Sequence, residues 1–413
     1  MHKYRTFDRE DTENEITMWR NQTVSQAELI GRVEQLQKRL AQEDISGAII
    51  LQNVDLFYFT GTMQKGILLV PARGEPLFFV EKGTIRAQRE SPYPVLPLSR
   101  GSLAIKELLR MANITTGRWG MELDCLPYNL YARWRNELKG EIVDVSPIIK
   151  RLRMIKSNFE LNAIRESGRI VAHVFRRAKD IIEEGMTELE VAALLEYEGR
   201  KKGHQGALRI RGFNQEMDNI CVTQGLSGTY PSFTEAPIFG IGLFPAFPHG
   251  ASWNRIKKHL PIVIDYGGGY EGYTTDETRV YVIDKMDETF KRPYEIAREI
   301  IEDTASFAKE GTPVRELYSR AAKKVEKERL ADYFMGYGEG KVSFLGHGIG
   351  LEIDELPVIT EKNNEVLQEG MVFAFEPKFV IPEKGVVGIE VDFIVHKGGL
   401  ERVTEIPIDI IYL

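Results

Sequence analysis

Four carboxylates interrupt apolar β patterns in the second half of the chain, and they constrain the fold more than any other feature. They lie in IVIDYG, DETRVYVI, VFAFEP and VGIEVDF, and they are Asp265, Asp276, Glu376 and Glu390. A carboxylate buried in an apolar strand is so costly that it requires a compensating cation. Arg279 is the only basic residue inside these four patterns, and strand alternation puts it on the opposite face from Asp276. Bound metal ions are therefore the better candidates.

The spacing of the carboxylates predicts that they meet in pairs. The first two flank a Gly-Gly-Gly segment suited to a hairpin, and the last two flank Pro382–Gly385. His347 lies in FLGHGIG, where glycines let the backbone come close to a bound centre. Four carboxylates and one imidazole form an oxygen-rich set that suits paired divalent ions such as Mn, Co, Fe or Zn, and two such ions would balance the negative charge.

The composition is that of an ordinary soluble globular protein. The 413 residues include 54 Lys plus Arg and 61 Asp plus Glu, a formal net charge of −7, and 43% are hydrophobic. These values exclude disordered, collagen and coiled-coil classes, and the acidic balance without a lysine-rich tract argues against nucleic-acid binding. Two cysteines, Cys125 and Cys221, can form neither a disulfide framework nor a cysteine-rich zinc site.

The chain divides into two patterned regions. In the first, the short apolar runs GAIIL, GILLV and PLFFV are separated by Gly, Pro and Asn and predict strands, so we expect an N-terminal α/β domain over residues 1–153. Capping boxes at Ser157 and Thr187 then begin long helices. Helical and β patterns follow one another to the C-terminus, which predicts an α+β domain over residues 154–413.

No segment predicts a membrane span or a secretory leader. The longest apolar stretch, residues 236–248, is shorter than the roughly 20 residues that cross a bilayer, and prolines and glycines interrupt it. The first 20 residues contain no apolar core of the kind that a secretory signal needs. We therefore expect a cytoplasmic protein that does not bind membranes.

Four segments carry a family resemblance. DYGGGYEGYTTDETR, GHGIGLEIDELP, FAFEPKF and GIE resemble, in order and spacing, the metal-binding blocks of the pita-bread metallopeptidases, the clan of methionine aminopeptidase, aminopeptidase P, prolidase and creatinase. The resemblance covers about residues 156–413, and the region before it resembles the N-terminal domain of the prolidase and creatinase branch. It implies a C-terminal pita-bread fold, an N-terminal α/β creatinase-like domain and a homodimer.

Carried over residue by residue, the resemblance implies a dinuclear metal site. Asp265 would chelate one ion, Asp276 and Glu390 would bridge both ions, and His347 and Glu376 would complete the other. Mn or Co is expected foremost, with Zn or Fe as alternatives. A hydroxide bridging the two ions would attack the substrate carbonyl, and Glu376 would be the general base.

The resemblance also places residues on the substrate side. His249, in PAFPHGAS, matches the family histidine that contacts the substrate near the scissile bond, where it would stabilise the tetrahedral intermediate. Two positions depart from the pattern: Asp354 stands where aminopeptidase P and prolidase carry a second histidine facing the substrate, and Gly388 stands where many relatives carry an arginine. A carboxylate at position 354 would repel a substrate carboxylate, so we expect a neutral or positive substrate group there.

We therefore expect a dinuclear metal-dependent hydrolase of a peptide C–N bond, of the Xaa-Pro aminopeptidase or dipeptidase type. One alternative is a creatinase-like amidohydrolase that acts on a small N-acylated or cyclic amino-acid derivative. A third reading is a catalytically silent peptidase-like binding protein. Such silent relatives typically lose metal ligands, whereas this chain keeps all five, which favours an enzyme acting on a peptide or small amide.

Overall fold

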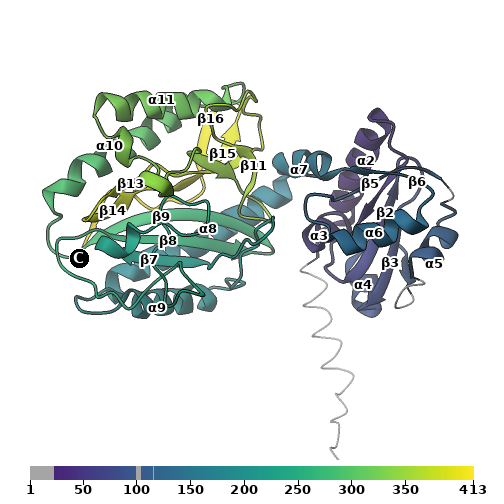
Figure 1. Cartoon of the computed structure of the whole chain (residues 1–413), viewed down its shortest axis with the longest axis horizontal. Coiled ribbons are helices and arrows are strands. Elements are labelled where there is room, and N and C mark those ends of the chain that lie inside the picture. Colours follow the sequence, from purple (N-terminus) through teal and green to yellow (C-terminus); the bar gives the residue numbers. More distant parts are fainter. Residues whose placement is uncertain (1–22, 99–103, 115) are drawn as a thin grey trace, which may run out of the picture. The chain divides into compact units, whose positions relative to one another are not determined.

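The computed structural model describes residues 23–98, 104–114 and 116–413 (Figure 1). The first 20 residues, in which no leader is predicted, lie outside these ranges. The chain forms two compact units, one that ends at Leu152 and one that runs from Arg153 to Leu413, and each has its own apolar core. Within the described ranges, every helix is too short or too polar to cross a bilayer.

The first unit is built on a six-stranded mixed sheet with the strand order β4-β3-β2-β1-β5-β6. The runs GAIIL, GILLV and PLFFV, predicted as strands, form β1, β2 and β3. The strands are β1 (Gly47–Ile50), β2 (Lys65–Pro71), β3 (Leu77–Lys82), β4 (Val95–Pro97), β5 (Gly117–Met121) and β6 (Gly140–Asp144). The helices are α2 (Gln26–Gln42), α3 (Asn53–Thr60), α4 (Thr84–Glu90), α5 (Ala104–Met111), α6 (Tyr128–Glu137) and α7 (Ser146–Met154), the last of which crosses the boundary between the units.

The second unit contains three sheets. One has the order β17-β9-β8-β7, the second has the order β11-β10-β12-β15-β16, and β13 and β14 pair with each other. The strands are β7 (Ile220–Gln224), β8 (Ile262–Tyr270), β9 (Tyr273–Val282), β10 (Gly346–Gly348), β11 (Glu355–Val358), β12 (Val372–Phe375), β13 (Lys378–Ile381), β14 (Gly385–Gly388), β15 (Val391–His396), β16 (Gly399–Arg402) and β17 (Ile411–Tyr412).

Four long helices cover these sheets in two pairs. Helix α8 packs on β8 and β9, and α9 packs on β7, whereas α10 packs on β14 and β16 and is covered by α11 (Figure 1). The helices are α8 (Asn158–Ile181), α9 (Glu188–Lys201), α10 (Glu288–Phe307) and α11 (Val314–Lys327), with the 3-10 turns η1 (Gly225–Gly228), η2 (Ala331–Tyr333) and η3 (Gly338–Gly340). Both predicted capping boxes are present at the starts of α8 and α9.

The length of α8 differs from the sequence expectation. The pattern predicts a helix that continues to Gly185, but α8 ends at Ile181 because Ile182 takes an extended conformation (φ −72°, ψ 123°). Gly185 lies in the following turn with a φ of 89°, a conformation that favours glycine. The apolar faces of α8 and α9 pack on β7, β8 and β9 in one cluster, and α10 and α11 pack on the other sheets in a second cluster.

Candidate metal centre

The β8–β9 hairpin carries the first two carboxylates. Its antiparallel register places Asp265 and Asp276 on the same face of the ladder, as diagonal neighbours on the two strands. The predicted hairpin is confirmed, but the Gly-Gly-Gly segment lies within β8 and does not form its turn. The turn is made by Glu271 and Gly272, whose φ values of 48° and 90° suit a tight two-residue connection.

The β13–β14 hairpin positions the second pair of carboxylates. Glu376 lies just before β13 and Glu390 just after β14, so the hairpin joins them as the sequence predicts. Thr278 of β9 donates a hydrogen bond from Oγ1 to Glu390 Oε2 at 2.9 Å, and the two residues also pair through their backbones. This contact ties the second hairpin to the first, so that all four carboxylates face one another.

His347 completes the predicted ligand set from β10. Its Nε2 lies 3.9 Å from Asp276 Oδ2 and 3.9 Å from Glu376 Oε1. The other ring nitrogen, Nδ1, lies 3.2 Å from the carbonyl oxygen of Gly348, a contact that fits a tautomer with Nε2 available as a ligand. One ligand atom each from Asp276, His347 and Glu390 lie within 4.8 Å of one another. The five residues predicted as ligands therefore come together.

A lysine ammonium lies among the same carboxylates. Lys378 Nζ is 2.7 Å from Glu390 Oε2, 2.9 Å from Asp265 Oδ2 and 3.0 Å from Glu376 Oε2, and its side chain is 3% exposed. The structure thus corrects the argument that no basic residue near the carboxylates could compensate them. Lys378 follows directly after VFAFEP and so lies outside the apolar patterns, in which Arg279 is the only basic residue.

Two sequence signals could have revealed this lysine. It lies two positions after Glu376, so strand periodicity puts both side chains on one face. It also stands in FAFEPKF, one of the segments that carry the resemblance. Arg279, the cation that sequence reasoning did consider, pairs instead with the buried carboxylate of Glu277 at 2.8 Å.

Burial strongly shifts the proton affinities in the centre. It raises the pKa of Asp276 well above its ordinary value, and the negative charges of Glu390 and Asp265 raise it further. Burial likewise raises the pKa of Glu390 to about 8, although Lys378 opposes the shift. Burial disfavours the ammonium of Lys378, but the surrounding carboxylates outweigh it and raise the pKa of Lys378. One lysine cannot balance four carboxylates, so the centre favours a further positive charge, either bound protons or a metal cation.

A pocket of about 290 Å³ opens onto the centre, and it contains both residues predicted on the substrate side, His249 and Asp354. His249 is 2% exposed, and neither of its ring nitrogens has a hydrogen-bond partner among the described residues; Asp218 Oδ2 lies 4.0 Å from Nδ1, too far for a hydrogen bond. Its ring is surrounded by those of Phe233, Phe239 and Phe247, with centroid distances of 5.8, 5.3 and 4.5 Å. An imidazole so buried and unsatisfied is suited to bind a polar group that enters the pocket.

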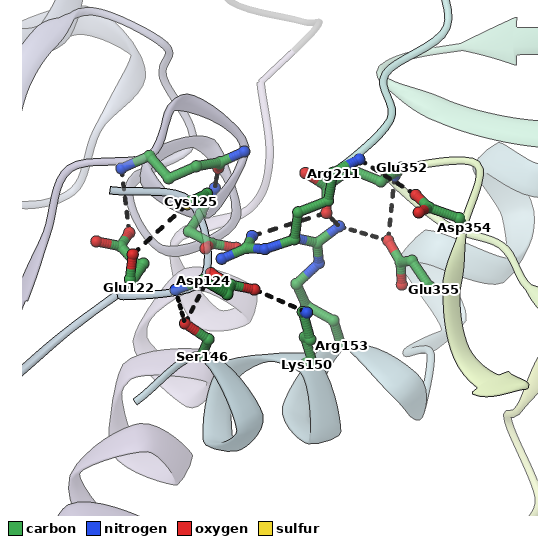
Figure 2. A network of polar contacts seen from close by, with 12 residues as sticks. Glu122, Asp124, Cys125, Ser146, Lys150, Arg153, Arg211, Glu352, Asp354 and Glu355 are labelled. Carbon is green, nitrogen blue, oxygen red and sulfur yellow. Dashed lines mark hydrogen bonds and ion pairs between the residues drawn. The ribbon is translucent and has the colours of Figure 1, made fainter. Parts of the chain in front are cut away.

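Asp354 is held at the wall of the same pocket by a polar network (Figure 2). Its Oδ1 accepts a hydrogen bond of 3.2 Å from the backbone N–H of Arg211. Arg153 Nη2 contacts Glu352 Oε2 at 2.8 Å and Glu355 Oε1 at 2.5 Å, which fixes the segment that carries Asp354. Burial raises the pKa of Asp354, and the Arg211 N–H opposes part of that shift.

Known protein families match nearly the whole described chain. The family described as Metallopeptidase family M24 matches residues 162–397, and the one described as Creatinase/Prolidase N-terminal domain matches residues 32–155. The chain is 31% identical over 378 residues to the Xaa-Pro dipeptidase of Pyrococcus furiosus, a match that covers 91% of this chain and 97% of the relative.

Solved structures agree with these matches. The Xaa-Pro dipeptidase from Bacillus anthracis is similar with a TM-score of 0.79 at 25% identity, covering 93% of this chain and 100% of that one. The X-Pro aminopeptidase from Thermotoga maritima is similar with a TM-score of 0.76 at 27% identity, covering 92% and 99%. The names of these relatives include both a dipeptidase and an aminopeptidase, so the likeness alone does not fix the length of a substrate.

Proposed function

The chain belongs to metallopeptidase family M24, and from that premise we propose that it hydrolyses peptide C–N bonds of the Xaa-Pro type. The predicted fold, an α+β pita-bread domain after an α/β creatinase-like domain, is confirmed by the two family matches and by the solved relatives. The observation that carries the proposal is the convergence of Asp276, His347 and Glu390 within 4.8 Å, on a pocket that also contains His249.

The donor chemistry fits a divalent metal ion. Asp276 and Glu390 offer carboxylate oxygens and His347 offers an imidazole nitrogen, a set suited to Mn or Co, with Zn or Fe as alternatives. When bound, such an ion supplies Lewis-acid activation of water and of the substrate carbonyl. The expectation of two ions stays a prediction, and it requires Asp265 and Glu376 to coordinate although both contact Lys378.

Glu376 is the proposed general base. The residue is 3% exposed, with Oε2 at 3.0 Å from Lys378 Nζ and Oε1 at 3.9 Å from His347 Nε2. A carboxylate held in this way could take a proton from the attacking water and deliver it to the leaving nitrogen. We propose that His249, whose ring nitrogens make no hydrogen bond among the described residues, donates one to the substrate oxygen on which negative charge develops.

The charge of the pocket supports a preference for substrates without a free carboxylate near its wall. Among the described residues that line it, Lys378 is the only lysine or arginine, and carboxylates already surround its ammonium. The acidic side chains of the lining outside the metal centre are Glu216, Asp218, Glu235 and Asp354. We propose that Xaa-Pro amides and longer Xaa-Pro peptides are cleaved faster than free Xaa-Pro dipeptides, because this wall repels a terminal carboxylate.

The test is a panel of Xaa-Pro dipeptides, Xaa-Pro tripeptides, Xaa-Pro amides and N-acyl amino acids, assayed with added Mn or Co. Cleavage of the Xaa-Pro substrates that is lost in Glu376→Ala is the expected result. Turnover of N-acyl amino acids alone would favour the creatinase-like alternative. Undiminished activity of Glu376→Ala would refute the assigned mechanism, and a purified chain that binds no divalent ion would favour the silent binding protein.

We also propose that the chain forms a homodimer. A homodimer is expected from the resemblance, and light scattering of the purified chain in solution measures it. A monomeric mass at all concentrations would contradict this part of the proposal without affecting the chemistry.

A further inference from the structure

We infer that the ammonium of Lys378 takes the place of a second metal ion, so that the centre binds one divalent ion per chain. The inference rests on the proposed metal-dependent function and concerns only the number of ions. It starts from the position of Lys378 Nζ, which lies within 3.0 Å of oxygens from three of the four carboxylates, Asp265, Glu376 and Glu390.

These contacts leave the ammonium fully engaged. A lysine ammonium has three N–H donors, and three carboxylate oxygens at 2.7 to 3.0 Å can accept all of them. A divalent ion that used the same oxygens would share them with a neighbouring positive charge, and like charges repel strongly in a buried site. Asp276 and His347 make no hydrogen bond or ion pair with the lysine, and they form the compact three-atom set with Glu390, whose Oε2 lies 2.7 Å from Lys378 Nζ.

The backbone around Lys378 leaves room for its side chain to reach the centre. Lys378 of β13 pairs directly with Gly388 of β14. A Cβ atom at position 388 would lie 2.7 Å from Lys378 Cα, 2.7 Å from its Cγ and 2.9 Å from its Cβ, distances that side chains do not tolerate. The stem of the lysine therefore occupies the space that glycine leaves open, and the pair Lys378–Gly388 directs the ammonium into the centre.

The sum of the charges in the described centre also favours one divalent ion per chain. Lys378 balances one of the four carboxylates, and one divalent ion balances two more. A second divalent ion would leave the centre with a net positive charge, next to Glu376, Lys378 and Glu390, which are almost completely buried. One ion and one ammonium therefore suit these ligands better than two ions and an ammonium.

The experiment measures metal content in the full-length chain. The protein is stripped with a chelator, loaded with Mn²⁺ or Co²⁺ and desalted, and the bound metal is quantified by mass spectrometry and by calorimetric titration. We expect one ion per chain, with the electron paramagnetic resonance signal of isolated Mn²⁺. Two ions per wild-type chain, with the signal of a coupled pair, would overturn the inference but leave the proposed function intact.

Substitution of Lys378 tests whether its ammonium limits the centre to one ion. Lys378→Met keeps an unbranched stem without the charge, and we expect it to bind two ions per chain. The matched control is Lys384→Met, which removes an exposed lysine from the turn of the same hairpin and should still bind one. A folded Lys378→Met variant that binds only one ion would overturn the inference. If that variant does not fold, the number of ions bound by the wild-type chain still tests the inference. A wild-type chain that binds no ion would refute the proposed function instead.

Discussion

The imidazole of His249 is buried without a hydrogen bond, and Asp218 Oδ2 lies 4.0 Å from its Nδ1. Both ring nitrogens are buried without a hydrogen-bond partner, while three phenylalanine rings pack around them. Buried polar groups of this kind are rare unless a ligand satisfies them. The burial of His249 without a hydrogen bond thus supports a role toward substrate.

His249→Ala should lower kcat for an Xaa-Pro substrate by roughly 10²-fold, the usual effect of removing one donor to a developing oxyanion. Metal content should not change, because His249 is not one of the residues whose ligand atoms cluster. Steady-state kinetics and metal analysis of the same preparation measure both quantities. A rise in KM with an unchanged kcat would mean that His249 only binds the substrate, contrary to the proposed role.

Asp354→Asn should change the choice of substrate more than the rate of the chemistry. The amide keeps a side-chain oxygen that can accept the Arg211 N–H bond and removes the negative charge from the pocket wall. We expect kcat/KM for free Xaa-Pro dipeptides to rise several-fold relative to the corresponding amides, because repulsion of the terminal carboxylate is relieved. An unchanged ratio between the two substrates would show that Asp354 does not sense that charge.

At the scale of the element, Glu122 fastens the end of β1 to the start of α3. It follows β5, is completely buried, and accepts hydrogen bonds from the backbone N–H groups of Leu51 at 3.2 and 3.0 Å and of Gln52 at 3.1 Å. Burial and the neighbouring charge of Asp55 raise the pKa of Glu122 to about 8, although the N–H groups oppose the shift. The folded chain therefore holds a proton on Glu122 that the unfolded chain releases above its ordinary pKa.

This raised pKa makes stability depend on pH in a definite direction. The contribution of protonated Glu122 is fully present below its unfolded pKa of 4.5 and is lost as the pH rises to about 8. The wild-type chain should lose a few kcal/mol of unfolding free energy over this interval, at up to about 1.4 kcal/mol per pH unit. Glu122→Gln, which cannot ionise, should flatten the dependence, whereas the exposed control Glu34→Gln should not. Denaturant melts between pH 5 and pH 8.5 measure this, and parallel curves for all three proteins would contradict it.

Periodicity and turn chemistry predicted the elements of the site but not their contacts. The strands around Asp265, Asp276, Glu376 and Glu390 follow from apolar runs, and two intervening turns pair them. The position of the first turn was missed because the glycine run lies within β8, while the positive φ values fall on Glu271 and Gly272. Lys378 was missed because its role depends on contacts across two hairpins, which no local pattern encodes.

In the described part of the whole molecule, the proposed ligands and the buried tryptophans fall in different units. All five proposed ligands belong to the unit from Arg153 to Leu413. Among the described tryptophans, Trp119 and Trp134 are buried in the first unit, and Trp253 of the second unit is 65% exposed. Tryptophan fluorescence should therefore report mainly on the unfolding of the first unit, while far-ultraviolet circular dichroism reports on both.

Metal loading should consequently stabilise the second unit more than the first. A ligand that binds only the folded state at 100 times its dissociation constant adds about 2.7 kcal/mol to the unfolding free energy, and this gain should fall on the unit that holds the site. Because the apolar clusters of the two units are separate, we expect Mn²⁺ or Co²⁺ to raise the dichroism transition of the second unit and to leave the fluorescence transition nearly unchanged. Asp276→Asn, which weakens the proposed site, should abolish the shift. Equal shifts in both signals would show that the units unfold as one, and no shift in either would count against the metal centre itself.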